Sequence, residues 1–168
     1  MREIFLDSID IASFIVKHCA ISNYFINLTK LQKLLYCCYG VMLAAFDERI
    51  CTEHPKAWPH GPVFPRVYNV TSRNRDGFVQ YLLEYKDQCK DLLSEDERTL
   101  LKKVIDAYAK YPAGKLVEWT HLPDSPWSYT VKNTGMHSSL DDSVIKSYFE
   151  KRLIKHASDK WYWHKRAW

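Results

Sequence analysis

The side chains best suited to chemistry in this sequence are its five cysteines and seven histidines. Cys51, His54 and His60 form a C-x2-H-x5-H pattern of the kind that can ligate zinc. A structural zinc site usually has four ligands arranged in two closely spaced pairs, and this pattern supplies fewer. We therefore expect neither a metal nor another cofactor.

His121 is the strongest candidate for acid–base chemistry, because Asp124 follows closely and can orient its ring. Such a histidine also commonly caps a helix end or holds the following loop through a hydrogen bond, and we favour that interpretation. A cysteine nucleophile with a histidine base stays open as an alternative, since such partners meet in space rather than in sequence. The chain has no G-x-S-x-G, H-E-x-x-H, G-x-G-x-x-G or G-x-x-x-x-G-K-[ST] motif, so we expect a binding protein rather than an enzyme.

A proline-rich stretch, KAWPHGPVFPRVY, is the most unusual segment of the chain. Its prolines fix backbone φ angles and remove N–H donors, which excludes a helix or a central strand. A rigid loop loses little entropy on binding, and aromatic side chains beside prolines make good anchors. We therefore predict a partner-binding surface here. Its residues are Trp58, Pro59, His60, Gly61, Pro62, Val63, Phe64, Tyr68, His121 and Trp127.

The alternative for this loop is structural: Trp58 and Pro62 would pack over Gly40 and fix the fold. Trp127, which closes the predicted turn PDSPW, has the same two interpretations. Asp124 and Ser125 can cap that turn, after which Trp127 either enters the core or serves as an interface anchor. For Trp127 we favour the core.

Helices must position these residues. DSIDIASFIVKHC predicts an amphipathic helix that opens at Asp7 or Ser8. TKLQKLLYCCYGVMLAAF opens with Thr29 and Gln32 in a T-x-x-Q capping-box arrangement. That second helix is apolar nearly all round, so we expect it to be the central, most buried element. Gly40 in its middle suggests close packing of a large side chain, with Trp58 and Trp127 as candidates.

Further helices follow the proline-rich loop. Pro65 suits the first position of a helix, and Ser94 with Glu97 forms a capping box. AGKLVEWTHL predicts a short helix, and SSLDDSVIKSYFEKRL predicts a last one, capped at Ser138 or Ser139. ERICTEHPKAW favours a short strand or hairpin, whereas FVQYLLEYKDQCKDLL is ambiguous. We predict a mainly α fold: a single compact helical domain with a central buried helix and a short β element before the proline-rich loop.

Composition is typical of a globular domain, with 46% hydrophobic and 26% charged residues in 168. Residues 1–154 form the predicted domain, and residues 155–168 form a tail that carries most of the formal charge of +4. Its lysines and tryptophans could contact phosphates and bases, but a nucleic-acid footprint usually has a wider basic face, so nucleic acid is an unlikely partner. No window is apolar enough for a membrane span, and the odd number of cysteines favours a reduced, cytoplasmic compartment.

Three blocks together resemble a known family. LTKLQKLLYCCYGVMLA, KAWPHGPVFPRVY and LSEDERTLLKKVIDAYAKYPAGKLVEWTHLPDSPWSYT are similar, in order and spacing, to the SocA-like antitoxin or Panacea domain of phage-associated GepA-type proteins. The similarity runs from about Asn27 to about Leu153, and the tail departs from the family pattern.

The resemblance implies an antitoxin of a bacterial or phage-borne toxin–antitoxin pair that neutralises its toxin by direct protein contact. It also leaves open an adapter that delivers the toxin to a ClpXP-type protease. Many family members carry an extra DNA-binding segment, and we see none in this chain. A small enzyme using His121, His60 or a cysteine, and a nucleic-acid-binding regulator using the tail, are the less favoured alternatives.

Overall fold

One long helix surrounded by shorter ones defines the fold. A computed structural model describes residues 2–155 and 161–163. The helices are α1 Ser8–Ile21, α2 Leu28–Phe46, α3 Pro65–Ser72, α4 Phe78–Glu84, α5 Cys89–Leu92, α6 Glu95–Tyr108, α7 Ala113–Thr120, α8 Pro126–Asn133 and α9 Asp142–Glu150. The strands are β1 Arg2–Leu6, β2 Glu48–Cys51, β3 Lys56–Trp58, β4 Gly61–Val63, β5 Leu153–Lys155 and β6 Trp161–Trp163.

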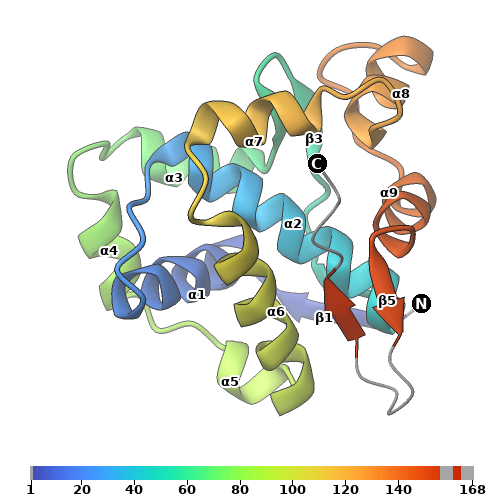
Figure 1. Cartoon of the computed structure of the whole chain (residues 1–168). Helices are drawn as coiled ribbons and strands as arrows, with labels where there is room; N and C mark the ends of the chain where they lie inside the picture. The colour runs from blue at the N-terminus through green and yellow to red at the C-terminus, as the bar shows by residue number, and fades with distance from the viewer. Residues whose placement is uncertain (1, 156–160, 164–168) are drawn as a thin grey trace.

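Helix α2 crosses the middle of the molecule, with α1 below it, α7 above it and α9 at one side (Figure 1). Every residue of α2 from Lys30 to Ala44 is buried, because neighbouring elements cover all of its faces. The predicted mainly α domain with a central buried helix is therefore confirmed.

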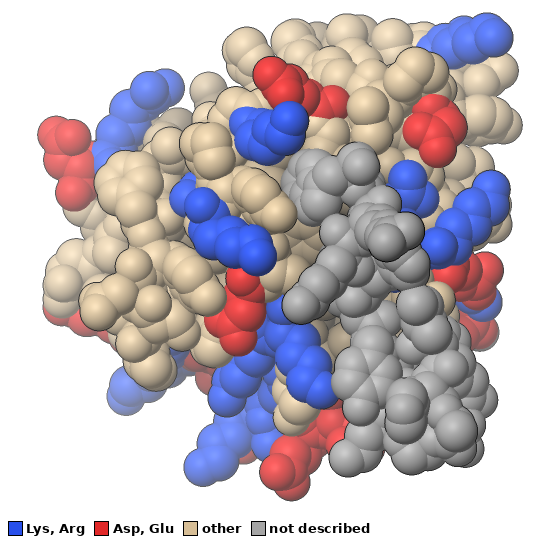
Figure 2. All heavy atoms as spheres, in the orientation of Figure 1, with Lys and Arg blue, Asp and Glu red and all other residues tan. Residues whose placement is uncertain are grey.

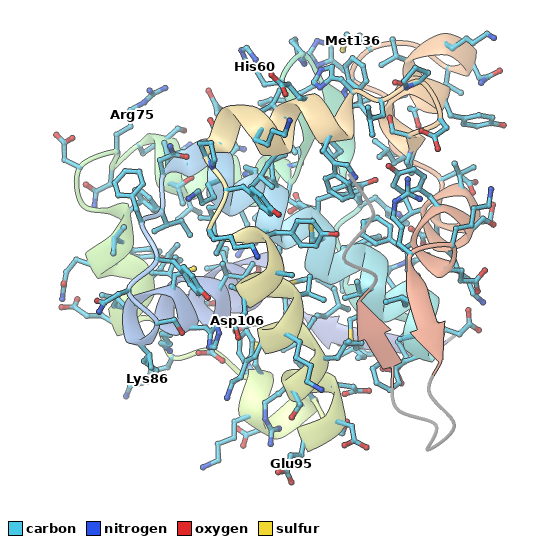
Figure 3. All side chains as sticks on the ribbon, viewed as in Figure 1. His60, Arg75, Lys86, Glu95, Asp106 and Met136 are labelled. Atoms are coloured by element: carbon cyan, nitrogen blue, oxygen red, sulfur yellow. The ribbon has the colours of Figure 1, made fainter. Side chains whose placement is uncertain are left out.

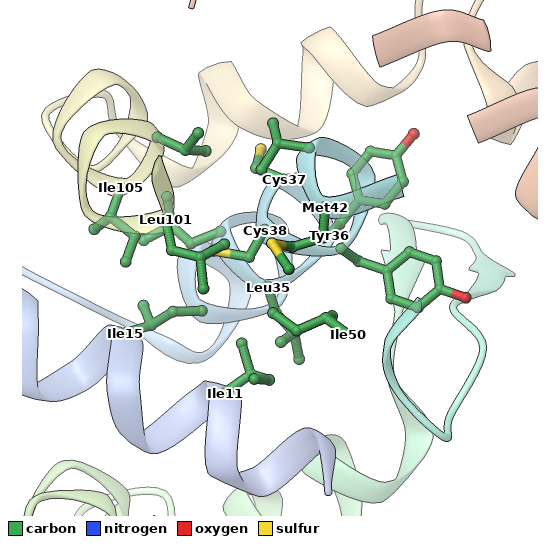
Figure 4. Close-up of a cluster of buried hydrophobic side chains, with 14 of the residues drawn as sticks. Ile11, Ile15, Leu35, Tyr36, Cys37, Cys38, Met42, Ile50, Leu101 and Ile105 are labelled. Atoms are coloured by element: carbon green, nitrogen blue, oxygen red, sulfur yellow. The ribbon is translucent and has the colours of Figure 1, made fainter. Parts of the chain in front are cut away.

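The core forms where α1, α2, α6 and β2 meet (Figure 4). Ile11 and Ile15 of α1 and Leu101 of α6 face the α2 side chains, and Ile50 of β2 closes one end. All are fully buried. Burying a large aliphatic side chain contributes roughly 1.5–3 kcal/mol, so this cluster fixes the position of α2.

Three small sheets complete the fold in the described part of the chain. β1 pairs in parallel with β2, and β3 pairs with β4 as an antiparallel hairpin. β5 pairs with β6, while residues 156–160 and 164–168 lie outside the described residues. The role of the predicted tail, residues 155–168, therefore stays a prediction.

Several local predictions were wrong. No strand was predicted before the first helix, but Arg2–Leu6 forms one in which Ile4 and Leu6 are buried and Phe5 is exposed, the alternation of a half-buried strand. PDSPW is not only a turn, because Ser125 caps α8 and Pro126 is its first residue. The Ser125 hydroxyl accepts a hydrogen bond from the Ser128 N–H, and this N-cap allows the helix to begin directly after Ser125.

Two predicted helix caps also differ. Asn27, rather than Thr29, caps α2, and its side chain accepts from the Lys30 N–H at 2.8 Å. Asp141, rather than Ser138 or Ser139, caps α9, because its carboxylate reaches two backbone N–H groups. The capping boxes at Asp7 and at Ser94 are present, and the Ser94–Glu97 prediction is confirmed.

The side chain that requires Gly40 is Phe149 of α9, not Trp58 or Trp127. A Cβ atom at position 40 would overlap the Phe149 ring. The absence of a side chain thus lets α9 approach α2 closely, with Tyr36 contacting Phe149 edge-on at a centroid distance of 5.4 Å. The sequence indicated the close approach but not its partner.

Charged side chains of both signs are mixed on the surface (Figure 2). On the face in Figure 2, basic and acidic side chains lie interspersed among uncharged ones. Among the residues that the structure describes, no helix is long and apolar enough to cross a membrane.

Candidate functional site

The proline-rich segment forms a tight hairpin rather than an irregular loop. Trp58 of β3 pairs with Gly61 of β4, which leaves Pro59 and His60 as the two-residue turn. Gly61 has a φ of +102°, a conformation that side-chain-bearing residues rarely adopt. No helix or central strand runs through residues 56–64, which form this two-stranded sheet, and α3 begins at Pro65 inside the quoted segment.

Two side chains of α2 hold the hairpin from inside. Gln32 pairs with the backbone of Phe64: its Oε1 accepts from the Phe64 N–H at 2.8 Å, and its Nε2 donates to the Phe64 carbonyl at 3.3 Å. Lys33 Nζ donates to the Pro62 carbonyl at 2.9 Å. A buried backbone carbonyl requires a hydrogen-bond donor, and proline has no backbone N–H to supply one. In this proline-rich segment the side chains of Gln32 and Lys33 therefore act as the donors.

Two aromatic side chains hold the hairpin tip, one from the residue that follows α7 and one from α8. Trp127 Nε1 donates to the Trp58 carbonyl at 2.8 Å, and His121 Nε2 lies 3.0 Å from the Pro59 carbonyl. The other ring nitrogen of His121, Nδ1, lies 2.7 Å from the Val117 carbonyl. A neutral imidazole has one N–H and donates to one of these oxygens, whereas the imidazolium donates to both.

The outer edge of β3 is covered as well. Ala57 donates its N–H to the Ser138 carbonyl and accepts from the His137 N–H, and Leu140 donates to the Pro55 carbonyl. Edge strands are otherwise open to pairing with other chains. The hairpin is therefore fixed on three sides and turns only its tip outward.

The predicted partner-binding residues fall into three groups by exposure. Pro59 and His60 are exposed at the tip, where Figure 3 labels His60. Trp58, Tyr68, His121 and Trp127 are half-buried. Gly61, Pro62, Val63 and Phe64 are buried and belong to the hairpin's inner side. The structure thus brings all ten residues to one end of the molecule, and their binding role stays a prediction.

A small pocket lies beside the hairpin. The hairpin, the first turns of α2 and Tyr68 of α3 enclose it. Its volume is about 120 Å³. Trp58 and Tyr68 form one wall, with ring centroids 4.9 Å apart in an edge-on arrangement. Lys33 also lines it, although only 1% of that residue is exposed.

Lys33 is the most strongly perturbed cation of the site. Burial lowers its pKa to about 7, while the neighbouring Cys37 acts in the opposite direction. The cause is desolvation, because the ammonium lies away from water and its described hydrogen-bond partner is a carbonyl rather than a carboxylate.

Sequence reasoning missed Gln32 and Lys33 as site residues. The sequence pattern places Gln32 in a capping box and points to no role for Lys33. The signal was present, because a helix predicted to be buried on all faces must provide partners for its polar side chains. Which backbone atoms they reach depends on the tertiary arrangement.

Other chemical candidates have structural partners. His121 does not pair with Asp124, whose carboxylate lies 3.8 Å from Arg152. The five thiols are free and buried. Desolvation raises the pKa of each thiol, and that of Cys19 to about 11. Because the thiolate is the nucleophile, these cysteines are weak nucleophiles. Within the described ranges, no group of three or more His, Cys, Asp or Glu side chains could hold a metal ion.

A second polar cluster surrounds Asp142 at the start of α9. Tyr39 donates its hydroxyl to Asp142 Oδ1 at 2.6 Å, and Arg49 donates to Oδ2 at 2.9 Å. His54 Nδ1 lies 3.5 Å from the same carboxylate. These contacts join α2, β2 and α9, so we assign the cluster a structural role.

Comparison with known proteins identifies a family for this chain. A sequence model described as antitoxin SocA-like, Panacea domain, matches residues 31–128, which is more than half of the chain. No curated protein and no solved structure is significantly similar to the chain. The matched range begins inside α2 and ends inside α8, and it contains the whole hairpin with its four side-chain anchors. The chain therefore belongs to the SocA-like antitoxin family of Panacea-domain proteins.

Proposed function

We propose that this chain is an antitoxin that neutralises a cognate toxin by direct protein contact, and that the hairpin end of the molecule contacts the toxin. Membership of the SocA-like antitoxin family is the observation that carries the proposal, since it points to a toxin as the partner. The five free thiols are consistent with a reduced compartment, and we place the interaction in the cytoplasm.

The hairpin suits a contact surface for a physical reason. Binding costs about 0.5–1.5 kcal/mol for each flexible side chain that it immobilises. The side chains of His121 and Trp127 are held by hydrogen bonds, and their rings lie 3.9 Å apart. The Trp58 ring packs against the Tyr68 ring. Little ordering entropy would be lost on docking this end of the molecule.

Binding to the product of the neighbouring gene tests this proposal. We expect a stable complex, and His60→Glu should weaken it by at least about tenfold, because the exposed tip would place a desolvated charge in the contact. Lys86→Ala is the matched control: Lys86 is exposed and lies away from His60 (Figure 3), so its substitution should leave the affinity unchanged.

Titration calorimetry on folded variants supplies the measurement. Unchanged affinity of His60→Glu would contradict the hairpin as the contact surface. Loss of the toxin from cells without a stable complex would instead indicate delivery to a ClpXP-type protease.

A further inference from the structure

Two buried lysines of α2 have very different surroundings. Lys30 Nζ donates to the Phe25 carbonyl at 3.0 Å and to the Ala109 carbonyl at 2.9 Å, and it also lies over the Phe25 ring. Lys33 Nζ has one hydrogen bond within the described part of the chain, to the Pro62 carbonyl. An ammonium group has three N–H donors, so Lys33 keeps donor capacity that the described fold does not use.

The pocket beside the hairpin is the place where this capacity could be used. Lys33 lines it together with Leu28, Trp58, Val63 and Tyr68, and its walls are largely apolar. Because only 1% of Lys33 is exposed, this residue lies on the buried side of the pocket. The volume of about 120 Å³ is similar to that of a cavity that holds benzene, which is roughly 150 Å³. The pocket therefore has room for one side chain and not for a peptide segment.

Charge complementarity selects the occupant. An apolar stem with a carboxylate at its end would pack its methylene groups on Trp58 and Tyr68 and bring a negative charge to Lys33. Among protein side chains glutamate has this form, and its two methylene groups carry the carboxylate further inward than aspartate can. A charge-assisted hydrogen bond is about twice as strong as a neutral one.

We propose that the pocket between α2 and the hairpin receives a glutamate side chain of the toxin, whose carboxylate pairs with the Lys33 ammonium. The identity of the partner rests on the proposed function, whereas the preference of the pocket for a carboxylate does not. The desolvated ammonium gains a counter-charge in the complex, which offsets the cost of its burial.

Protonation provides a readout that a purely structural role would not give. Free Lys33, with its pKa lowered to about 7, is mostly neutral at about pH 8, and the carboxylate would restore its proton. Binding should therefore take up close to one proton at that pH. The titratable groups around Lys33 and its pocket are Cys37 on α2, His60 on the hairpin and Tyr68 on α3. His121, which directly follows α7, contacts the Pro59 carbonyl at the hairpin tip.

The first experiment needs no toxin. N-acetyl-L-glutamate N-methylamide is titrated into the full chain while the NMR signals of the Lys33 ε-methylene and the Trp58 indole are followed. We expect the glutamate probe to shift the Lys33 and Trp58 signals and to leave the Lys30 signals in place. The uncharged glutamine analogue should shift the Lys33 and Trp58 signals far less. An equal response to both probes, or no response at Lys33 to either, would overturn the proposal.

The second experiment uses the complex with the neighbouring gene product. Calorimetry in two buffers of different ionisation enthalpy should show proton uptake by the wild type and none by Lys33→Met, whose affinity falls by about 10- to 100-fold. Lys30→Met is the matched control and should keep the proton uptake.

The two experiments separate this inference from the proposed function. A tight complex without Lys33-dependent proton uptake would overturn the pocket as a toxin contact and leave the antitoxin function in place. A glutamate response in the pocket without any toxin complex would instead refute the antitoxin function, and with it the toxin as the source of the glutamate.

Discussion

Lys33 combines a cost to the fold with a candidate role in binding. Its side chain is 1% exposed, and desolvation lowers its pKa from 10.5 to about 7. A pKa shift of one unit corresponds to about 1.4 kcal/mol, so the burial penalty amounts to several kcal/mol when the lysine is charged. Residues that cost stability in this way are common at functional sites.

The pH dependence of stability tests this assignment. Between about pH 7 and pH 10.5 the unfolded chain holds the lysine proton and the folded chain does not, so the free energy of unfolding contributed by Lys33 rises with pH. Below about pH 7 both states hold the proton, and the penalty is fully present. We expect wild type to gain stability relative to Lys33→Met across this window in urea unfolding.

The control for this prediction is Lys102→Met, which removes an exposed lysine of α6 and should leave the slope of wild type unchanged. Parallel pH profiles for wild type and Lys33→Met would show that Lys33 is not desolvated in solution.

Gly61 is the second residue that the hairpin depends on. A Cβ atom there would lie 2.9 Å from Lys33 Cε and closer still to the Thr120 hydroxyl, in addition to the strain of its positive φ. We predict that Gly61→Ala lowers the free energy of unfolding by about 1–3 kcal/mol more than Gly135→Ala does. Gly135 is the matched control, because its φ is +101° and nothing lies within 4 Å of the added atom.

Chemical denaturation of both variants measures the difference. Equal losses would mean that backbone strain alone, and not the contact with Lys33 and Thr120, requires glycine at position 61.

Some residue-level features follow from sequence and others do not. The Ser94–Glu97 capping box was predictable because both partners lie within one turn. Thr29 and Gln32 have the same spacing, yet Gln32 bonds to Phe64, which lies on the hairpin and outside any local pattern. The pocket and the environment of Lys33 depend on such long-range contacts.

At the scale of elements, α2 and α9 pack tightly against each other at Gly40. The missing side chain at Gly40 admits the Phe149 ring, which is buried and stands edge-on to the rings of Tyr36 and Trp119. Because that ring has neighbours on several sides, it has little freedom to move away.

Substitution of two helical glycines tests this packing. Gly40→Ala should lower the free energy of unfolding by about 1–3 kcal/mol, because overpacking outweighs the gain in helix propensity. Gly114→Ala, in α7, should raise it by up to about 1 kcal/mol, since nothing lies within 4 Å of the added atom. A stabilising Gly40→Ala variant in thermal or urea unfolding would contradict the close packing of α2 and α9.

Element types were largely predictable. In α1, α6 and α7 apolar residues recur at helical spacing, and α2 is a long apolar stretch without Pro. Strand β1 was missed because five residues give little alternation to detect, and its pairing with β2 is long-range. Helix α8 was missed because PDSPW has turn chemistry, which also suits a capped helix start.

At the scale of the whole molecule, four elements converge on one end. The hairpin, the first turns of α2, Tyr68 of α3 and the α7–α8 junction all contribute to it, while the apolar core fills the region around α2 (Figures 1 and 4).

The measurement that tests the central claim most directly is growth of a bacterial host that expresses the neighbouring gene, with and without this chain. We predict growth arrest by the neighbour alone, relief by the wild-type chain, and recovery of both proteins as a complex from the same culture. A neighbour that is harmless on its own, or an arrest that this chain does not relieve, would contradict the antitoxin function.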